Sequence, residues 1–204
     1  EATVRVSRTA ARALLRARAA RSFGASVPPA RSTTATSCCR RATAYALVCH
    51  GRFPHLGLSR HMTAADREAV ELAMERTGVA AWRDRNLREL SGGERQRVYI
   101  AMALCQESGN LLLDEPSAWL DAPRQFELLE LLKSLAGQGK AVVLVLHELA
   151  QAMAYADKIA LLSGGELRAA LPPEELFASG LAEEVFGVAL RRAPDGTYYV
   201  RPRD

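Results

Sequence analysis

The chain has 204 residues, of which 49% are hydrophobic and 25% charged, with a formal net charge of +4. This length and apolar content suit one domain of ordinary size with a real core. The sequence holds no run of about 18 apolar residues, which argues against a membrane-spanning helix. The four cysteines show neither a C-x-x-C pattern nor a Cys/His ligand spacing, which favours a reduced protein on the cytosolic side.

The charge is divided unevenly along the chain. Residues 1–46 hold nine arginines and one acid, a net +8, so the remainder holds 27 − 9 = 18 basic and 23 − 1 = 22 acidic residues, a net −4. The first segment is also rich in Ala, Ser and Thr and includes Pro28-Pro29. Such a composition predicts a basic, low-complexity segment that does not fold by itself.

Two functional interpretations of residues 1–46 are open at this point. A nucleic-acid-binding arm would use the positive charge, but no aromatic residues alternate with the arginines to stack on bases. A mitochondrial-type presequence is likewise rich in Arg and Ser and poor in acids. We expect no nucleic-acid partner.

The first predicted helix covers residues 66–77. It places Val70, Ala73, Met74 and Thr77 on one face and ends at Gly78. The histidines that flank this region are irregularly spaced and have no Cys or carboxylate beside them, so loop histidines are favoured over a metal site. They are His50, His55 and His61.

A second helix is predicted to begin after Ser91. Ser91 and Glu94 have the spacing of a capping box, and an apolar stripe (Val98, Ala101, Met102, Cys105) follows at helical period. The free N–H groups and the positive dipole end of such a helix suit a phosphate, and Gly92 and Gly93 let the backbone approach it closely.

A short apolar strand is predicted at residues 111–115. It delivers two adjacent carboxylates, Asp114 and Glu115, at its carboxyl end, where open α/β sheets place their ligands. The glycine-bearing helix start and the acidic strand end together predict one nucleotide site.

The remaining elements alternate between helix and strand. Asp121 and Pro123 are placed to start a helix, and residues 141–146 are apolar throughout, as in a parallel strand covered on both faces. The pattern predicts an α/β fold with a mostly parallel sheet and flanking helices. The later expected elements are a helix at 148–156, a strand at 159–162, a turn at 163–166, short helices at 172–177 and 181–186, and a hairpin of 188–192 with 197–200.

Four motifs in family order resemble the ATP-binding subunit of ATP-binding cassette (ABC) transporters. They are the signature Leu90–Val98, the Walker B strand 111–115, the D-loop 117–121 and a switch histidine, His147. Residues 47–55 and the tail are similar to importers of iron-siderophore, haem and cobalamin. The resemblance implies a partial ABC ATPase domain over 47–204, with a helical subdomain at about 47–100, a Walker B/H-loop core at about 101–170 and a C-terminal extension at about 171–204.

The resemblance also implies cofactors, roles and partners. ATP and Mg²⁺ are the expected cofactors for an ATP hydrolase, and the expected partners are a second copy or a paired ABC subunit, membrane permease subunits and, through the permease, a periplasmic-type substrate-binding protein. The chain would lie peripherally on the cytoplasmic face of the membrane. By this resemblance, Asp114 would hold Mg²⁺ through water, Glu115 would polarise the attacking water, and His147 would sense the γ-phosphate. The residues implied to contact ATP held by the other subunit are Ser91, Gly92, Gly93 and Glu94. Asp121 would contact the other subunit across the dimer.

The sequence departs from this family in its first part. Walker A and the glutamine loop are expected there, yet no Lys precedes Lys133 and no Gln precedes Gln96. A third interpretation of residues 1–46 is therefore a frame-shifted translation, because residues 3–8 permit codons that spell Gly-Pro-Gly-Lys-Ser in another frame. We expect the chain alone neither to bind ATP tightly nor to hydrolyse it.

Alternatives to a working importer ATPase remain. One is a non-catalytic, truncated or degenerate ABC subunit, and another is a basic-armed nucleic-acid binder built on the same fold. A soluble DNA-repair or translation ATPase is disfavoured, because such proteins usually carry two cassettes or long coiled-coil insertions.

Overall fold

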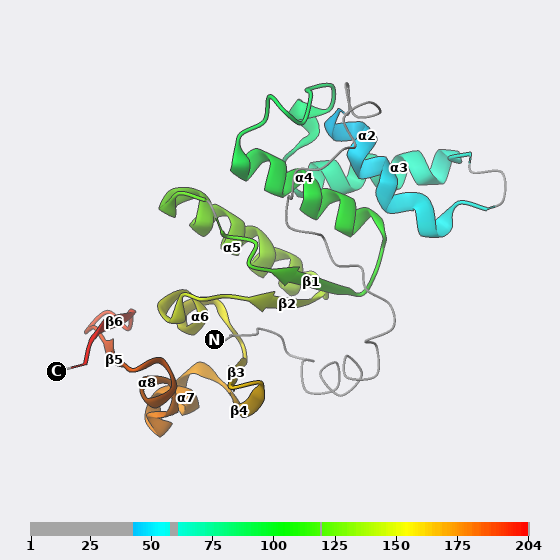
Figure 1. Cartoon of the computed structure of the whole chain (residues 1–204). Helices are drawn as coiled ribbons and strands as arrows, with labels where there is room; N and C mark the ends of the chain where they lie inside the picture. Colours follow the sequence, from blue (N-terminus) through cyan, green and yellow to red (C-terminus); the bar gives the residue numbers. More distant parts are fainter. Residues whose placement is uncertain (1–42, 58–60, 119, 204) are drawn as a thin grey trace. The chain divides into compact units, whose positions relative to one another are not determined.

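The computed structural model describes residues 43–57, 61–118 and 120–203 (Figure 1). These residues form two compact units, which we describe separately. The helical unit holds the described residues up to 108 together with 120–128, and the α/β unit holds 109–118 and 129–203. The predictions made for residues 1–42 lie outside the described residues.

The helical unit is built around one helix, α4, that the other helices contact. The helices α2 and α3 both pack on α4, and the side chains of Val48, Val70, Met74, Val98 and Ile100 are fully buried among them. The elements are α2 (Ala44–Cys49), the 3₁₀ helix η1 (His50–His55), α3 (Ala64–Arg76), the 3₁₀ helix η2 (Ala80–Trp82) and α4 (Gly92–Cys105).

The helix predicted at 66–77 is confirmed, with a start two residues earlier. The Thr63 hydroxyl accepts a hydrogen bond from the Asp66 amide, and Asp66 accepts one from the Thr63 amide, so a capping box starts α3 at Ala64. Gly78 has φ +69°, a left-handed conformation that ends the helix as predicted.

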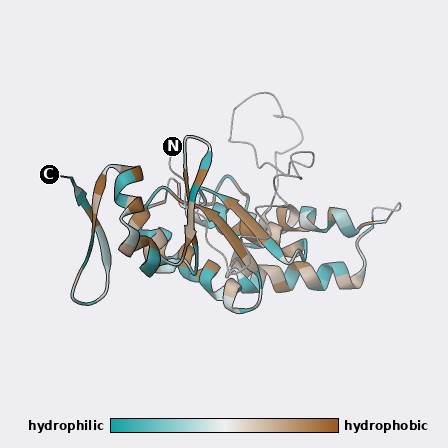
Figure 2. Ribbon diagram, turned by 90° about the horizontal axis from the view of Figure 1, so that it is seen from below, coloured by the Kyte–Doolittle hydropathy of each residue, from teal (hydrophilic) through white to brown (hydrophobic). Residues whose placement is uncertain are grey.

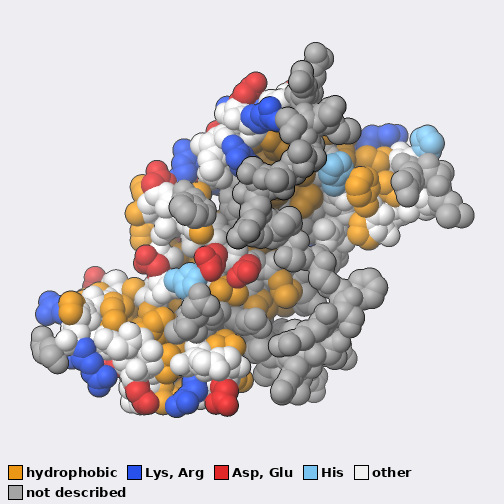
Figure 3. Space-filling model, in the orientation of Figure 1, with side chains coloured by type: hydrophobic (Ala, Val, Ile, Leu, Met, Phe, Trp, Pro, Cys, Tyr) orange, Lys and Arg blue, Asp and Glu red, His pale blue; other side chains and the backbone are white. Residues whose placement is uncertain are grey.

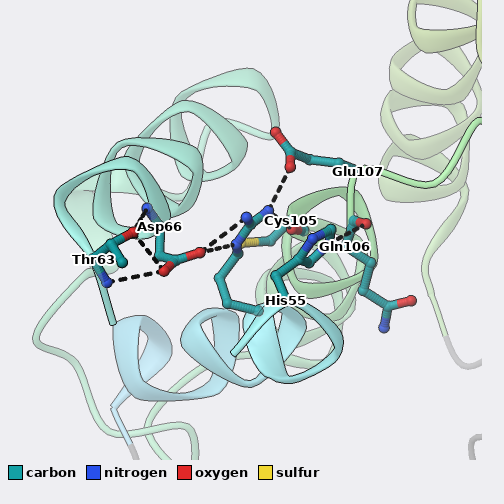
Figure 4. Close-up of polar contacts among 7 residues, drawn as sticks. His55, Thr63, Asp66, Cys105, Gln106 and Glu107 are labelled. Carbon is teal, nitrogen blue, oxygen red and sulfur yellow. Dashed lines mark hydrogen bonds and ion pairs between the residues drawn. The ribbon is translucent and has the colours of Figure 1, made fainter. Parts of the chain in front are cut away.

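One buried arginine joins three elements of this unit (Figure 4). Arg52, which is 6% exposed, donates from Nε to Asp66 Oδ1 at 2.9 Å, and from Nη1 to the Cys105 carbonyl at 3.0 Å and to Glu107 Oε2 at 2.7 Å. Hydrogen bonds from the Thr63 hydroxyl and amide, and then from Arg52, lower the pKa of Asp66 to about 2. Because the guanidinium is fully paired, its burial is compatible with a stable fold.

The histidines of this region do not gather into a cluster of metal-ligating side chains within the described residues. His55 Nε2 lies 2.9 Å from the Gln106 carbonyl oxygen (Figure 4). Within the described ranges, no group of three or more His, Cys, Asp or Glu is placed to hold a metal ion. Of the four cysteines, Cys49 and Cys105 lie in these ranges, and both are free thiols.

The α/β unit contains the predicted parallel pair of strands. The strand β1 (Asn110–Asp114) pairs with β2 (Ala141–Val145) in a register that sets Asp114 opposite Val145. The helix α5 (Ala122–Gly137) connects them, as a parallel crossover requires. The buried leucines of α5 are Leu128, Leu129, Leu132 and Leu135, whereas Leu131 is half-buried.

The prediction that residues 141–146 are covered on both faces is only partly correct. Val142 and Leu144 are buried, but Val143 and Val145 on the other face are half-buried. Leu112 on the paired strand is 67% exposed. An apolar run predicts a strand, whereas burial of each face depends on the layers that pack against it, which the run itself does not encode.

The rest of this unit follows the predicted order. After α6 (Leu149–Tyr155), the antiparallel strands β3 (Ile159–Ser163) and β4 (Glu166–Leu171) form a hairpin through the predicted turn. The tail contains α7 (Pro173–Ser179), α8 (Leu181–Phe186), and the predicted hairpin of β5 (Val188–Arg192) with β6 (Tyr198–Pro202). In Figure 2 the helices carry both hydrophilic and hydrophobic colours, as amphipathic elements do. None of the helices in the described part of the chain has the length and hydropathy needed to cross a bilayer.

Candidate functional site

The start of α4 has the capping box that the sequence predicts. Ser91 Oγ accepts from the Glu94 amide at 3.3 Å, and the Ser91 amide donates to Glu94 Oε2 at 2.7 Å. Gly92 and Gly93 form the first turn of the helix, and Gly92 is exposed. The first turn therefore offers backbone amides next to a small residue, which is the geometry that suits an anion.

Glu94 has a structural role in this turn. Besides its bond to Ser91, it pairs with Arg85, whose Nη1 lies 3.3 Å from Glu94 Oε1. The hydrogen bonds from the Ser91 amide and hydroxyl, and then the Arg85 charge, lower the pKa of Glu94. Its carboxylate thus stays ionised and holds the cap, while the neighbouring arginine Arg95 donates to the carbonyls of Leu87 and Leu90.

The carboxyl end of β1 carries the two predicted carboxylates. Asp114 is the last residue of the strand, and Glu115 follows with φ +46°, a left-handed conformation that is costly for a residue with a Cβ. The Glu115 amide donates to the Val145 carbonyl at 3.2 Å, and its carbonyl accepts from the Ala118 amide at 3.1 Å. These bonds hold the strained residue in place, as is common at functional sites.

His147 meets Glu115 at the ends of the paired strands. His147 Nε2 lies 2.6 Å from Glu115 Oε1, and the two side chains are 52% and 47% exposed. A carboxylate can only accept, so Nε2 is the donor, and Glu115 keeps its other oxygen for another partner. Acidic and histidine side chains are accessible next to one another on the face drawn in Figure 3.

The donor set at this strand end fits Mg²⁺ when other oxygens complete it. Asp114 and Glu115 are adjacent and exposed, and Mg²⁺ is usually bound by one or two carboxylates together with substrate phosphates and waters. Asp114 would hold the ion, leaving Glu115 to its contact with His147.

The predicted site residues are divided between the two units. Asp114, Glu115 and His147 lie in the α/β unit, whereas the turn at 91–94 and Asp121 belong to the helical unit. Asp121 accepts from the Arg124 amide at 3.3 Å, so it starts α5 as predicted. Arg124 and Glu127 were not predicted from the sequence. The available signal was their regular spacing, since Asp121, Arg124 and Glu127 follow one another at intervals of three residues.

Comparisons with known proteins place the chain in a family. The family described as ABC transporter matches residues 17–118, which is 118 − 17 + 1 = 102 of 204 residues, half of the chain. The match begins inside the arginine-rich segment 1–46.

Two curated relatives are named as ATP-binding proteins of transport or import. The chain is 42% identical over 147 residues to the ferric enterobactin transport ATP-binding protein FepC of Escherichia coli K12, covering 72% of this chain and 54% of FepC. It is 49% identical over 136 residues to the hemin import ATP-binding protein HmuV of Streptomyces coelicolor, covering 67% of this chain and 48% of HmuV. The chain therefore spans about half the length of these relatives.

A solved structure agrees with this fold. CbiO1 from Clostridium perfringens, part of the ABC transporter complex CbiONQ, superposes with a TM-score of 0.60 at 27% identity, covering 71% of this chain and 56% of CbiO1. Since the family match covers half of the chain and the fold matches an ABC ATPase domain, the chain belongs to the ABC transporter family.

Proposed function

We propose that this chain serves as an ATP-binding subunit of an ABC importer, and that the assembled importer couples ATP hydrolysis to uptake of a ferric siderophore, haem or cobalamin. The names of the relatives support the first two ligands, since FepC is a ferric enterobactin and HmuV a hemin protein. Cobalamin rests on the motif resemblance alone.

The observation that carries the proposal is the contact of 2.6 Å between His147 and Glu115. It brings a histidine and a carboxylate to the ends of two parallel strands, where α/β proteins bind ligands. In the proposed mechanism, Glu115 accepts a hydrogen bond from the attacking water through its free oxygen. His147 orients Glu115 in the structure described here and donates to the γ-phosphate when nucleotide is held.

Asp114 completes this set of roles. Bound Mg²⁺ supplies positive charge to the β- and γ-phosphate oxygens during phosphoryl transfer. Asp114 would hold the ion through water, while the Ser91 side chain and the amides of Gly92 and Gly93 would meet the γ-phosphate of ATP held by a second subunit. Asp121 would contact that subunit as well.

A second ABC subunit is the proposed partner of the turn at Ser91. The 204 residues contain no Gly-x-x-x-x-Gly-Lys-Ser/Thr sequence, and the first lysine is Lys133. In a head-to-tail pair with a complete ABC subunit, the turn at Ser91 would face the partner's Walker A, and that composite site would be whole. Permease subunits at the cytoplasmic face of the membrane, and through them a substrate-binding protein, would complete the importer.

ATP turnover before and after supply of a Walker A segment tests the catalytic roles. We expect no turnover by the chain alone, and Mg²⁺-dependent turnover once a Walker A-bearing N-terminal segment from an ABC relative is joined at residue 47. Glu115→Gln should then reduce turnover about a hundredfold or more, since a general base contributes at least that much. Glu166→Gln, at an exposed glutamate that begins β4, is the matched control.

Two results would contradict the proposed chemistry. One is turnover by the joined protein that Glu115→Gln leaves unchanged, and the other is turnover by the original chain. The transported ligand is tested separately, by uptake of labelled ferric siderophore, haem or cobalamin in cells that lack the matching importer ATPase.

A non-catalytic ABC subunit is the second candidate. Such a subunit would bind its paired subunit and the permease without turning over ATP. It is preferred if the joined protein binds ATP but shows no turnover, while co-purification with permease subunits persists.

A further inference from the structure

Two adjoining contacts tie the start of α4 to the start of α5 within the helical unit. The first is a close approach at Gly93, which is buried in the first turn of α4. A Cβ placed on Gly93 would lie 2.8 Å from Arg124 Cδ and 3.5 Å from Leu120 Cδ2. The aliphatic stem of Arg124 therefore lies directly against the glycine backbone, and a Cβ at position 93 would require that stem to shift.

The second contact is an ion pair one turn further along both helices. Arg97 Nη2 bonds to Glu127 Oε2, with side chains 25% and 52% exposed. Arg97 follows Gly93 by four residues on α4, and Glu127 follows Arg124 by three on α5, so each pair lies on one helix face. The two contacts therefore run side by side along the facing surfaces of the two helices.

Each helix start also has its first backbone hydrogen bond. In α4 the Arg95 amide donates to the Ser91 carbonyl at 2.9 Å, and in α5 the Gln125 amide donates to the Asp121 carbonyl at 3.0 Å. Asp121 Oδ1 lies 4.0 Å from Arg124 Nε, so the residue that packs on Gly93 also lies close to Asp121. The turn at 91–93 and the residue Asp121 are thus parts of one connected structure.

We infer that Arg97, Arg124 and Glu127 are positioning residues that hold Asp121 and the turn at Ser91 in a fixed mutual arrangement. Under the proposed function, on which this inference rests, both of these features meet the second subunit. The three side chains would then place Asp121 and the turn at Ser91 so that both contact the second subunit at the same time. We call them the α4–α5 clamp.

Amide hydrogen exchange of the whole chain, without nucleotide, tests the clamp directly. The amides of Arg95 and Gln125 report on the two helix starts. Arg97→Gln and Glu127→Gln should each accelerate exchange at both amides by about 1.4- to 5-fold, the range expected from the worth of a partly exposed ion pair. The charge reversal Arg97→Glu with Glu127→Arg should restore slow exchange.

A matched control comes from the α/β unit. Arg192 Nη1 pairs with Glu174 Oε2 at 3.1 Å in an ion pair whose side chains are 45% and 64% exposed. Arg192→Gln should leave exchange at Arg95 and Gln125 unchanged. The clamp is overturned if the single variants accelerate amide exchange at Arg95 but not at Gln125. It is also overturned if the chain with both charges reversed shows the exchange rate expected from adding the two single effects.

Turnover by the chain paired with a complete ABC subunit tests the use of the clamp. We expect Glu127→Gln to lower kcat with an unchanged KM for ATP, because the signature contact forms only when the subunits close, and the charge reversal to recover kcat. Unchanged kcat in the single variants would overturn the positioning role. If the unaltered pair shows no turnover, the proposed function fails, and the exchange result alone decides whether the clamp exists.

Discussion

The tetrapeptide Ser-Gly-Gly-Glu occurs twice in this chain, with two different conformations. At residues 91–94 it starts α4, with Ser91 as the cap and both glycines in the helix. At residues 163–166 it joins β3 to β4, and Gly164 and Gly165 have φ +59° and +80°. The same four residues therefore form a helix start in one place and a hairpin turn in the other.

The flanking residues explain the difference. Arg95, Gln96 and Arg97 follow the first copy, and they are good helix formers ahead of an apolar stripe. The second copy lies between two strands that pair with each other, so that Ser163 and Glu166 face one another across the hairpin. Only the first copy presents consecutive amides of a helix start, which is what a phosphate needs. The residues that flank this tetrapeptide therefore decide whether it can bind a phosphate.

Substitution of each serine should give the largest difference between the two copies. In the composite ATPase formed with a complete ABC subunit, Ser91→Arg should lower turnover about a hundredfold or more, because it fills the space proposed for the γ-phosphate and removes a donor. Ser163→Arg should leave turnover within twofold, by the same reasoning about neighbours. Equal losses in steady-state ATP hydrolysis would show that the two copies do not differ in function.

Substitution of a glycine should lower stability more in the copy at 163–166 than in the copy at 91–94, which is the reverse of the order expected for turnover. Gly165→Ala places a Cβ at φ +80° and should lower the free energy of unfolding by about 1–2 kcal/mol. Gly92→Ala lies in an exposed helical turn and should change it by less than about 0.5 kcal/mol. Urea unfolding followed by circular dichroism measures both. A greater loss in Gly92→Ala would contradict the assigned conformations.

The same contrast explains what the sequence could predict about the fold. The Ser91 cap, the stop at Gly78 and the turn at Gly164-Gly165 depend on residues within four positions of one another, so local patterns were enough. The strand at 141–146 and a mostly parallel sheet followed from an apolar run after a helix, whereas the pairing of β1 with β2 was not predicted. The cap, the stop, the turn and the strand were predicted close to their observed bounds.

Features that join distant segments could not be predicted in the same way. Arg52 meets Asp66 and Glu107 across 14 and 55 residues, and nothing in its spacing indicates this network. The resemblance named Glu115 and His147, but their contact depends on the left-handed backbone at Glu115, which precedes Pro116, where extended backbone is favoured. The burial of each strand face likewise depends on packing.

Loss of the serine hydroxyl alone should give a smaller effect than the glycine at φ +80°. Ser91→Ala removes the acceptor of the Glu94 amide and should cost about 1 kcal/mol of unfolding free energy. Ser163→Ala caps no helix and should cost less than about 0.5 kcal/mol. Urea unfolding of the two variants side by side gives this difference. Equal costs would mean that the cap at Ser91 contributes no more than an ordinary surface serine.

The smallest expected effect is the dependence of the α4 cap on pH. Because the pKa of Glu94 is lowered in the folded chain, its ionised form stabilises the fold at pH values above the unfolded glutamate pKa of about 4.3. This stabilisation is lost as the pH falls below that value and passes through the lowered pKa, since the folded state must then take up a proton against its hydrogen bonds. Glu94→Gln should therefore lower stability at pH 7 and lose less stability than the unaltered chain between pH 5 and about pH 3. Ser91→Ala should weaken the same dependence, because the Ser91 side chain is one of the groups that lower the pKa of Glu94. If Glu94→Gln and the unaltered chain lost equal free energy of unfolding over this range, Glu94 would not be the carboxylate that secures the first turn of α4.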